Sequence, residues 1–225
     1  MSYLGTQYPT TRQPYTDYPL QLVTHLEEVA GLSKFRLGAL LELGCGRGDF
    51  VKAWRLLGYV TNGVDREAVL EHVIQVDLAK DPIPMLSGSY GTVFSKSLIE
   101  HLSDPSNMLN EAKRVLKPGG TLIIMTPDWR TYMKTFYDDY THVRPYDVVS
   151  LRDLLEAHGF KDVTSTRMYQ YPALWYHPRL AWAATLWRWL TPVEFSLWLS
   201  KVTGIQFFRW ASQLTILAIG RKDRM

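Results

Sequence analysis

The run that most constrains the fold lies at residues 40–49, Leu-Leu-Glu-Leu-Gly-Cys-Gly-Arg-Gly-Asp, where an apolar strand leads into alternate glycines. A stretch with helical spacing follows it, near residues 48–58. Glycines at such a turn let a ligand approach the backbone closely, and the start of a helix offers N–H groups without intrahelical partners. The run therefore predicts a strand, a ligand-binding turn and a helix of an α/β sheet.

Apolar strands alternate with amphipathic helices along most of the chain. Strands are expected at 37–43, 59–64, 72–76, 90–96, 121–127, 161–169 and 213–221, and helices at 20–33, 48–58, 104–116 and 150–160. Such alternation implies right-handed crossovers and a largely parallel sheet covered on both faces. The sequence Lys-Pro-Gly-Gly at 117–120 predicts a turn between a helix and a strand. No linker is apparent, so residues 1–225 are expected to form one domain.

Two regions depart from this alternation. Residues 1–19 combine tyrosines with prolines, which predicts an irregular aromatic arm. Residues 171–210 are rich in Trp and lie between the last two strands. Their spacing predicts two helices, near 178–190 and 192–203. We interpret this insert as a candidate lid, and a plain helical pair packed on the sheet or on a second subunit is the alternative.

Composition narrows the class of protein. The chain has 225 residues and a net charge of +3, which is too weak to indicate a nucleic-acid partner. Cys45 is its single cysteine, so no internal disulfide is possible and a cytoplasmic location is expected. Residues 1–21 lack the pattern of a signal peptide, and no apolar run approaches the roughly 20 residues of a membrane span.

The glycine spacing separates candidate ligands. The fingerprint of a nicotinamide dinucleotide site is GxGxxG, whereas this turn is GxGxG. Asp49 stands where GxGxxG would have its third glycine. A carboxylate there would repel a pyrophosphate. Asp65 ends the second strand and could accept both hydroxyls of a ribose, while Asp77 and Leu78 end the third and could meet an adenine. Three neighbouring strand ends thus suit a nucleoside without phosphate.

With these motifs the sequence resembles the class I S-adenosylmethionine-dependent methyltransferases. LLELGCGRG is similar to their first motif, GVD at 63–65 to their second and VDL at 76–78 to their adenine-contacting segment. Residues 94–105 and 111–120 are similar to the segments that follow strand four and precede strand five. The resemblance implies a Rossmann-like, doubly wound sheet in the order 3-2-1-4-5-7-6, with the last strand antiparallel and a helical insert before it. Gly91 departs from an aspartate that is common in relatives.

The resemblance also implies S-adenosylmethionine as cofactor and a role for each matching residue. The turn glycines would pass beneath the methionine part, Glu42 would lie near its amino group, and the backbone around Lys96 would contact it. Asp65 would hold the ribose, and Asp77 and Leu78 would meet the adenine. The expected cofactor-binding residues are Glu42, Gly44, Gly46, Gly48, Asp65, Asp77, Leu78 and Lys96. Each alone also has a structural interpretation, and their order along the chain favours the functional one.

Two histidines are candidate general bases for the acceptor. His101 follows the fourth strand and His142 follows the fifth, and histidine titrates near neutrality. Either side chain could instead brace its loop. Asp138, Asp139 and His142 could together ligate a metal, but the three are local in sequence and no further ligand is evident, so no metal site is expected.

The leading interpretation is methyl transfer to a small-molecule acceptor, and the expected target is an oxygen of a saccharide or of a lipid-linked, apolar molecule. Asp128 and Trp129 could line the acceptor pocket. Two alternatives stay open: a methyltransferase of nucleic acid or protein, and a non-enzymatic cofactor-binding or scaffold protein. A homodimer, and peripheral membrane contact through the Trp-rich insert, are also left open.

Overall fold

The computed structural model describes residues 17–33, 38–67 and 73–224. They form a seven-stranded sheet in the order β3-β2-β1-β4-β5-β7-β6, in which β7 is antiparallel to both neighbours. The strands are β1 (Leu40–Leu43), β2 (Thr61–Asp65), β3 (Val73–Gln75), β4 (Tyr90–Lys96), β5 (Leu116–Pro127), β6 (Lys161–Met168) and β7 (Thr215–Arg221). The predicted fold and strand order are confirmed. Most of the predicted arm at 1–19 lies outside the described residues.

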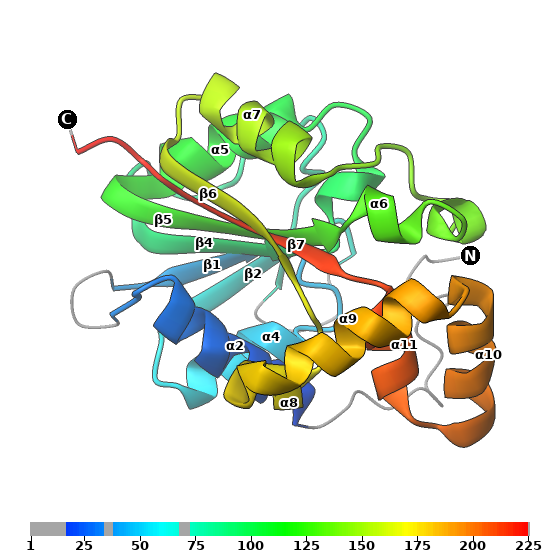
Figure 1. Ribbon diagram of the computed structural model, residues 1–225. Helices are drawn as coiled ribbons and strands as arrows, with labels where there is room; N and C mark the ends of the chain where they lie inside the picture. Colours follow the sequence, from blue (N-terminus) through cyan, green and yellow to red (C-terminus); the bar gives the residue numbers. More distant parts are fainter. Residues whose placement is uncertain (1–16, 34–37, 68–72, 225) are drawn as a thin grey trace.

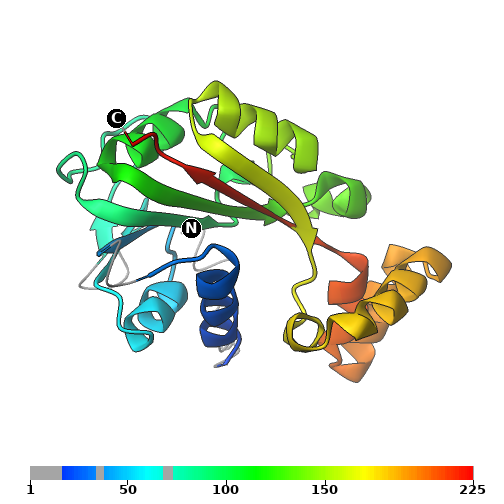
Figure 2. The same ribbon diagram turned by 60° about the vertical axis from the view of Figure 1, so that its left-hand side comes forward.

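Helices cover both faces of the sheet (Figure 1). On one face lie α2 (Tyr18–Val29) and α4 (Asp49–Leu56), and on the other lie α5 (Ser106–Val115) and α7 (Val148–Ala157), as the turned view in Figure 2 also shows. β1 buries all four of its residues because both faces of the sheet are covered. No helix in the described part of the chain is long and apolar enough to cross a membrane.

Strand β5 begins earlier than the sequence predicted, and this corrects the turn expected at residues 117–120. Leu116 already pairs with Tyr90 of β4, and the next pair is Thr121 with Thr92, so β5 carries an irregularity here. Gly119 has a left-handed φ of +71°, and a Cβ on Gly120 would meet the carbonyl oxygen of Lys117 at 2.8 Å. The Pro-Gly-Gly run therefore makes a bulge within the ladder rather than a connection outside it.

The insert between β6 and β7 has more helices than the two predicted. It contains α8 (Pro172–Tyr176), η3 (Pro178–Leu180), α9 (Ala181–Leu190), α10 (Val193–Thr203) and α11 (Gln206–Ser212). Trp175 stacks on His25 of α2 at a ring distance of 4.9 Å, and Trp210 lies 5.2 Å from the ring of Tyr18. The insert thus lies at the carboxyl edge of the parallel strands, beside α2 (Figure 1).

Replacement of Trp54 on α4 tests the packing of the core between the sheet and the helices α2 and α4. Its side chain is fully buried and lies edge-on to Tyr59 and Phe94. We expect Trp54→Ala to lower the free energy of unfolding by about 3–5 kcal/mol, because it leaves a cavity in a packed interior. Denaturant unfolding measures the change. Leu56→Ala on the same helix is the control, since Leu56 is 75% exposed and should change stability little; equal effects of the two variants would contradict this packing.

Candidate functional site

The turn between β1 and α4 is built on three left-handed glycines. Gly44, Gly46 and Gly48 have φ angles of +69°, +51° and +71°, a region that other residues enter at a cost. A Cβ on Gly44 would also lie 3.0 Å from the side chain of Leu98, so space as well as φ favours glycine. The turn predicted to cradle a ligand is therefore formed by glycine backbone, with the side chain of Leu98 packed against Gly44.

Asp65 fastens this turn to the end of β2. Its Oδ2 accepts a hydrogen bond of 2.8 Å from the backbone N–H of Gly46, and its Oδ1 accepts one of 3.0 Å from that of Glu67. Each carboxylate oxygen has a second lone pair, so these bonds leave acceptor capacity for a ligand hydroxyl. The expected ribose-binding carboxylate thus also fixes the turn.

Glu42 is a buried acid beneath the same turn. Its Oε2 has no hydrogen-bond partner among the described residues, which is costly for a buried oxygen. Burial, with the negative charges of Asp49 and Asp65, raises the pKa of Glu42 well above its usual value, and the ammonium of Lys96 opposes this. A cationic ligand group at this position would satisfy the oxygen and restore the charged carboxylate.

Two other expected contact residues lie just beyond β3. Asp77 is half-buried, accepts from the N–H of Ala79 at 3.1 Å and lies 3.4 Å from the Nζ of Lys80. Leu78 is buried and belongs to the hydrophobic core between the sheet and the helices α5 and α7. The side chain of Leu78 therefore supports the sheet edge.

Lys96 is the last residue of β4, adjoining the glycine turn. Its Nζ lies 5.7 Å from the ring centre of Phe50, close enough for a cation–π contact. Burial lowers the pKa of Lys96, and the carboxyl of Glu100 acts in the opposite direction. Together, Glu42, Gly44, Asp65 and Lys96 surround the carboxyl ends of β1, β2 and β4.

The two predicted histidines, far apart in sequence, are brought together. His101 ends a short helix, η1 (Ile99–His101), and the ring centres of His101 and His142 are 4.8 Å apart. Nδ1 of His142 lies 2.7 Å from the carbonyl oxygen of Phe136, so it carries the proton and donates. Nδ1 of His101 lies 2.9 Å from the hydroxyl and 3.2 Å from the carbonyl oxygen of Thr141. Since that hydroxyl donates its own proton to Asp139, Nδ1 of His101 donates likewise. In the neutral state, both rings therefore bear their lone pair on Nε2.

Glu100 joins this pair, and the sequence analysis assigned it no role. It is fully buried, its Oε2 accepts from the hydroxyl of Thr126 at 2.8 Å, and its Oε1 has no partner among the described residues. Burial raises the pKa of Glu100 to about 7. One ligand atom from each of Glu100, His101 and His142 lies within 4.8 Å of the others. The only signal in the sequence was its position next to His101.

The other acids considered near His142 are arranged differently. Asp139 approaches His142 at 3.9 Å, and its Oδ1 accepts from the hydroxyl of Thr141 at 2.6 Å. Asp138 is not part of the cluster that Glu100 forms with the two histidines.

Asp128 is buried and holds Arg167 of β6 at 2.7 Å, and Trp129 begins a helix, α6 (Trp129–Tyr132). Asp128 thus ties the ends of β5 and β6 together.

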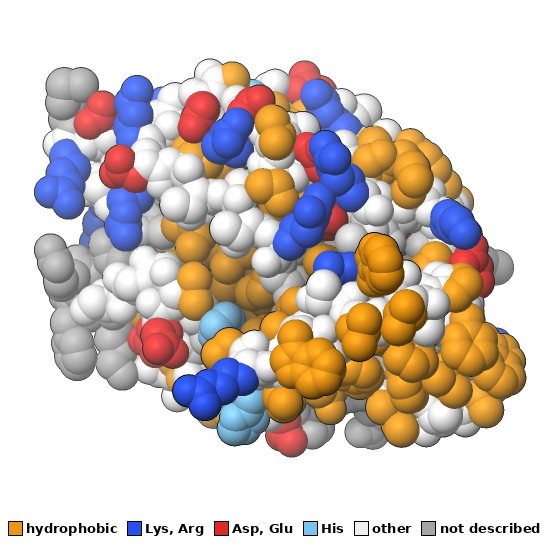
Figure 3. All heavy atoms as spheres, viewed as in Figure 1, with side chains coloured by type: hydrophobic (Ala, Val, Ile, Leu, Met, Phe, Trp, Pro, Cys, Tyr) orange, Lys and Arg blue, Asp and Glu red, His pale blue; other side chains and the backbone are white. Residues whose placement is uncertain are grey.

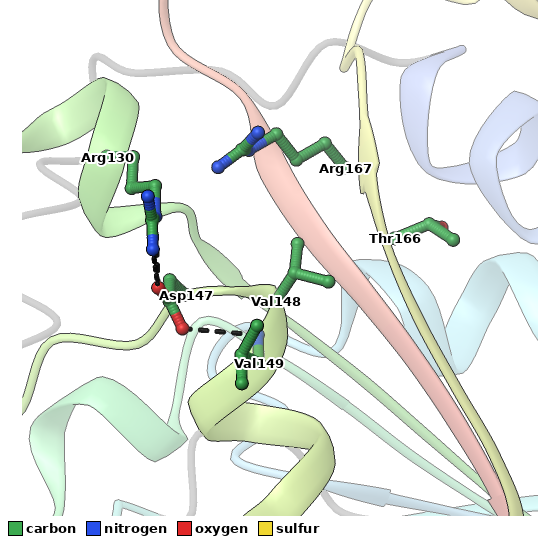
Figure 4. Close-up of a pocket in the computed structure, with 6 residues that line it drawn as sticks. All are labelled: Arg130, Asp147, Val148, Val149, Thr166 and Arg167. Atoms are coloured by element: carbon green, nitrogen blue, oxygen red, sulfur yellow. Dashed lines mark hydrogen bonds and ion pairs between the residues drawn. The ribbon is translucent and has the colours of Figure 1, made fainter.

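A separate pocket of about 500 Å³ lies between the start of α7 and β6 (Figure 4). Its charged groups are already paired: Arg130 contacts Asp147 at 2.8 Å, and Arg167 contacts Asp128. Asp147 also caps α7 through the N–H of Val149. None of the expected cofactor or base residues lines this pocket, which therefore stands apart from the candidate site.

Comparison with known proteins places this site in a family. The model of a family described as "Methyltransferase domain" matches residues 17–165. A probable S-adenosylmethionine-dependent methyltransferase of Mycolicibacterium smegmatis is 33% identical over 139 residues, covering 54% of this chain and 51% of that protein. A malonyl-[acyl-carrier protein] O-methyltransferase of Yersinia pestis is 34% identical, over 39% of this chain and 36% of that protein. The chain thus spans about half the length, or less, of these curated relatives.

Solved structures agree on the fold. Phosphoethanolamine N-methyltransferase 2 of Haemonchus contortus, solved with S-adenosyl-L-methionine, superposes with a TM-score of 0.64 at 17% identity, covering 98% of this chain and 59% of that one. The matched family model includes the glycine turn, Asp65 and both histidines. The chain therefore belongs to the methyltransferase domain family, within the class I S-adenosylmethionine-dependent methyltransferases.

Proposed function

We propose that this protein transfers a methyl group from S-adenosylmethionine to an oxygen atom of a small-molecule acceptor, either a saccharide or a lipid-linked, apolar molecule. The observation that carries the proposal is the pair of histidines, which the fold brings together at the carboxyl edge of the sheet with both Nε2 atoms basic. An oxygen acceptor needs a base for its proton, and S-adenosylmethionine supplies a methyl group already activated on a sulfonium.

The residues at the glycine turn fit this cofactor. The unpartnered Oε2 of Glu42 suits the ammonium of a methionine, and the left-handed backbone at Gly44, Gly46 and Gly48, which carries no Cβ, allows close approach. Asp65 would hold the ribose hydroxyls with its remaining lone pairs, and Asp77 would meet the adenine. In this arrangement the buried side chain of Leu78 supports the sheet edge on which the adenine would lie. The backbone at Lys96 would contact the methionine part.

The histidines would remove the acceptor proton and hold the acceptor in line. Burial lowers the pKa of His101, with a further contribution from the charge of His142, so the His101 ring is neutral at neutral pH. A proton taken at Nε2 would be stabilised by the neighbouring carboxyls of Glu100 and Asp139. Proximity, orientation and this proton transfer are the contributions that the chain itself makes to the rate.

The alternatives have less support. Methylation of nucleic acid would be favoured by a strongly basic surface, and the net charge of the chain is only +3. A non-enzymatic scaffold role does not require two half-buried histidines with matched tautomers. The name of the Yersinia relative, malonyl-[acyl-carrier protein] O-methyltransferase, agrees with an oxygen acceptor.

Asp65→Ala tests the cofactor site. We expect the dissociation constant for S-adenosylmethionine to rise by a factor corresponding to about 1–3 kcal/mol, because charge-assisted hydrogen bonds are lost. Titration calorimetry measures the constant. Asp153→Ala is the control, since Asp153 is exposed and, among the described residues, its recorded ion pair is with its neighbour Arg152. Unchanged affinity in the Asp65 variant would rule out its role.

Replacement of each histidine by asparagine tests the base. An asparagine amide can still donate from near the Nδ1 position, but it has no basic Nε2. We expect His101→Asn or His142→Asn to lower kcat by roughly 10²–10⁴-fold, while the affinity for S-adenosylmethionine is kept. Turnover of a labelled methyl group onto saccharide and lipid-linked acceptors provides the readout. Full activity in both single variants would refute the proposed base.

The pH dependence follows from the direction of the His101 shift. The pKa of His101 is lowered, so the ring is neutral above that pKa and loses its basic Nε2 as the pH falls through it. We expect kcat/KM to fall on the acid side with a midpoint below about 6.5, the ordinary histidine value. The pH profiles of kcat/KM for the wild type and for His101→Asn should differ on the acid side. Identical profiles would exclude His101 as the titrating base.

A further inference from the structure

The Trp-rich insert presents large apolar side chains to solvent. Figure 3 shows hydrophobic side chains gathered over α9 and α10. Trp189 is 84% exposed and Trp182 67%. We call this surface the aromatic face; its exposed members are Leu180, Trp182, Leu186, Trp189, Leu190, Phe195, Trp198, Val202 and Ile205. A concentration of this kind marks an interaction surface, because single exposed apolar residues are ordinary but a contiguous patch is not.

The two helices carry their apolar side outward. On α10 the buried residues are Ser196 and Ser200, whereas Phe195, Trp198 and Val202 are exposed. Had this helix been built only to pack on its own domain, the aromatic residues would face inward and the serines outward. The side chain of Ser196 instead receives the indole N–H of Trp187 at 3.0 Å, which joins α10 to α9 through polar contacts.

Helix α9 continues the same face. Its exposed residues Trp182, Leu186 and Trp189 recur at the spacing of one helical stripe, and Ala184 is its one fully buried residue. Trp187 of α9 makes the contact with α10 through its hydrogen bond to Ser196, whereas the exposed apolar side chains of α9 remain outside. Two short helices with outward aromatic stripes form one apolar surface.

The charges of the insert are almost all positive. Glu194 is the only acidic residue between 171 and 213, and it is paired with Lys134 at 2.9 Å. Arg179 and Lys201 are exposed, and the structure records no ion pair for either among the residues it describes. In the sequence Arg179 and Lys201 directly precede Leu180 and Val202 of the aromatic face. Exposed cations next to exposed apolar side chains match the surface of an anionic bilayer, where rings enter the interface and cations meet lipid phosphates.

We propose that the aromatic face binds the surface of an anionic lipid bilayer. A second copy of the chain fits less well, because a symmetric interface through this face would set the same unpaired cations against one another. The insert lies at the carboxyl edge of the sheet, so a protein bound in this way holds its candidate site near the membrane. The proposal stands on the insert alone and does not depend on which acceptor is methylated.

The experiment compares vesicles of phosphatidylcholine with vesicles that also contain phosphatidylglycerol. Co-sedimentation of the full chain measures binding, and a blue shift of Trp emission reports burial of the rings. Binding to the anionic vesicles is expected, and Trp189→Ser combined with Trp198→Ser should weaken it at least about tenfold, since both rings lose their apolar contact. Leu86→Ser is the matched control, because Leu86 is 83% exposed outside the insert.

A second pair of variants tests the charge. Arg179→Glu with Lys201→Glu should weaken binding to the anionic vesicles, and added salt should reduce binding of the wild type. Circular dichroism and cofactor affinity establish that every variant is folded. Absence of wild-type binding to anionic vesicles would overturn the proposal. So would a dimer in light scattering that the Trp variant converts to monomer without any vesicle binding, which would assign the face to a second copy.

Discussion

The hydrogen bond from the N–H of Gly46 to the carboxylate of Asp65 is the contact on which the candidate site depends. It joins the turn after β1 to the end of β2, two strands that are neighbours in the sheet but separated by α4 in the chain. The turn itself has glycines in left-handed conformations and few side chains of its own to hold it. The same carboxylate can therefore both shape the turn and receive a ligand on it.

A second constraint is the burial of ionisable groups around this edge. Burial raises the pKa of Glu42 and of Glu100 and lowers the pKa values of Lys96 and His101. All four shifts favour the neutral form, because a low-dielectric surrounding disfavours charge of either sign. A cationic group bound beside Glu42 would offset part of the free-energy cost of a buried carboxylate. Ligand binding and the charge state of the site are therefore coupled.

Much of the sheet could be predicted from the sequence because the signals were local. The apolar run before Gly44, the short distance to Asp65 and the order of the later strands each depend on few residues, and the structure reproduces the predicted order. The partnership of His101 with His142 was not predicted, only that both lie at the same edge. Their contact arises from the packing of η1 against the loop after β5, where the carbonyl of Glu100 accepts from Val143.

Other features could not be predicted because they depend on distant partners. Glu100 looked like an ordinary polar residue, and its importance comes from burial against Thr126 of β5. The Pro-Gly-Gly run reads as a turn until β4 is placed beside it, and then it becomes a bulge. The outward aromatic stripe of α10 has helical spacing like any amphipathic helix, so spacing alone could not say which side meets the domain.

The antiparallel placement of β7 has a consequence for how this domain can change. Since β5 and β6 both run against β7, the chain leaves the sheet after β6 and re-enters it for β7 at one edge. Residues 169–214 can thus lengthen or be exchanged without altering a single strand pair, and the entropic cost of a longer connection grows only slowly with length. The family match ends at residue 165, just before this region. The strand pairing of the sheet can therefore stay as it is while the connection beside its carboxyl edge varies in length.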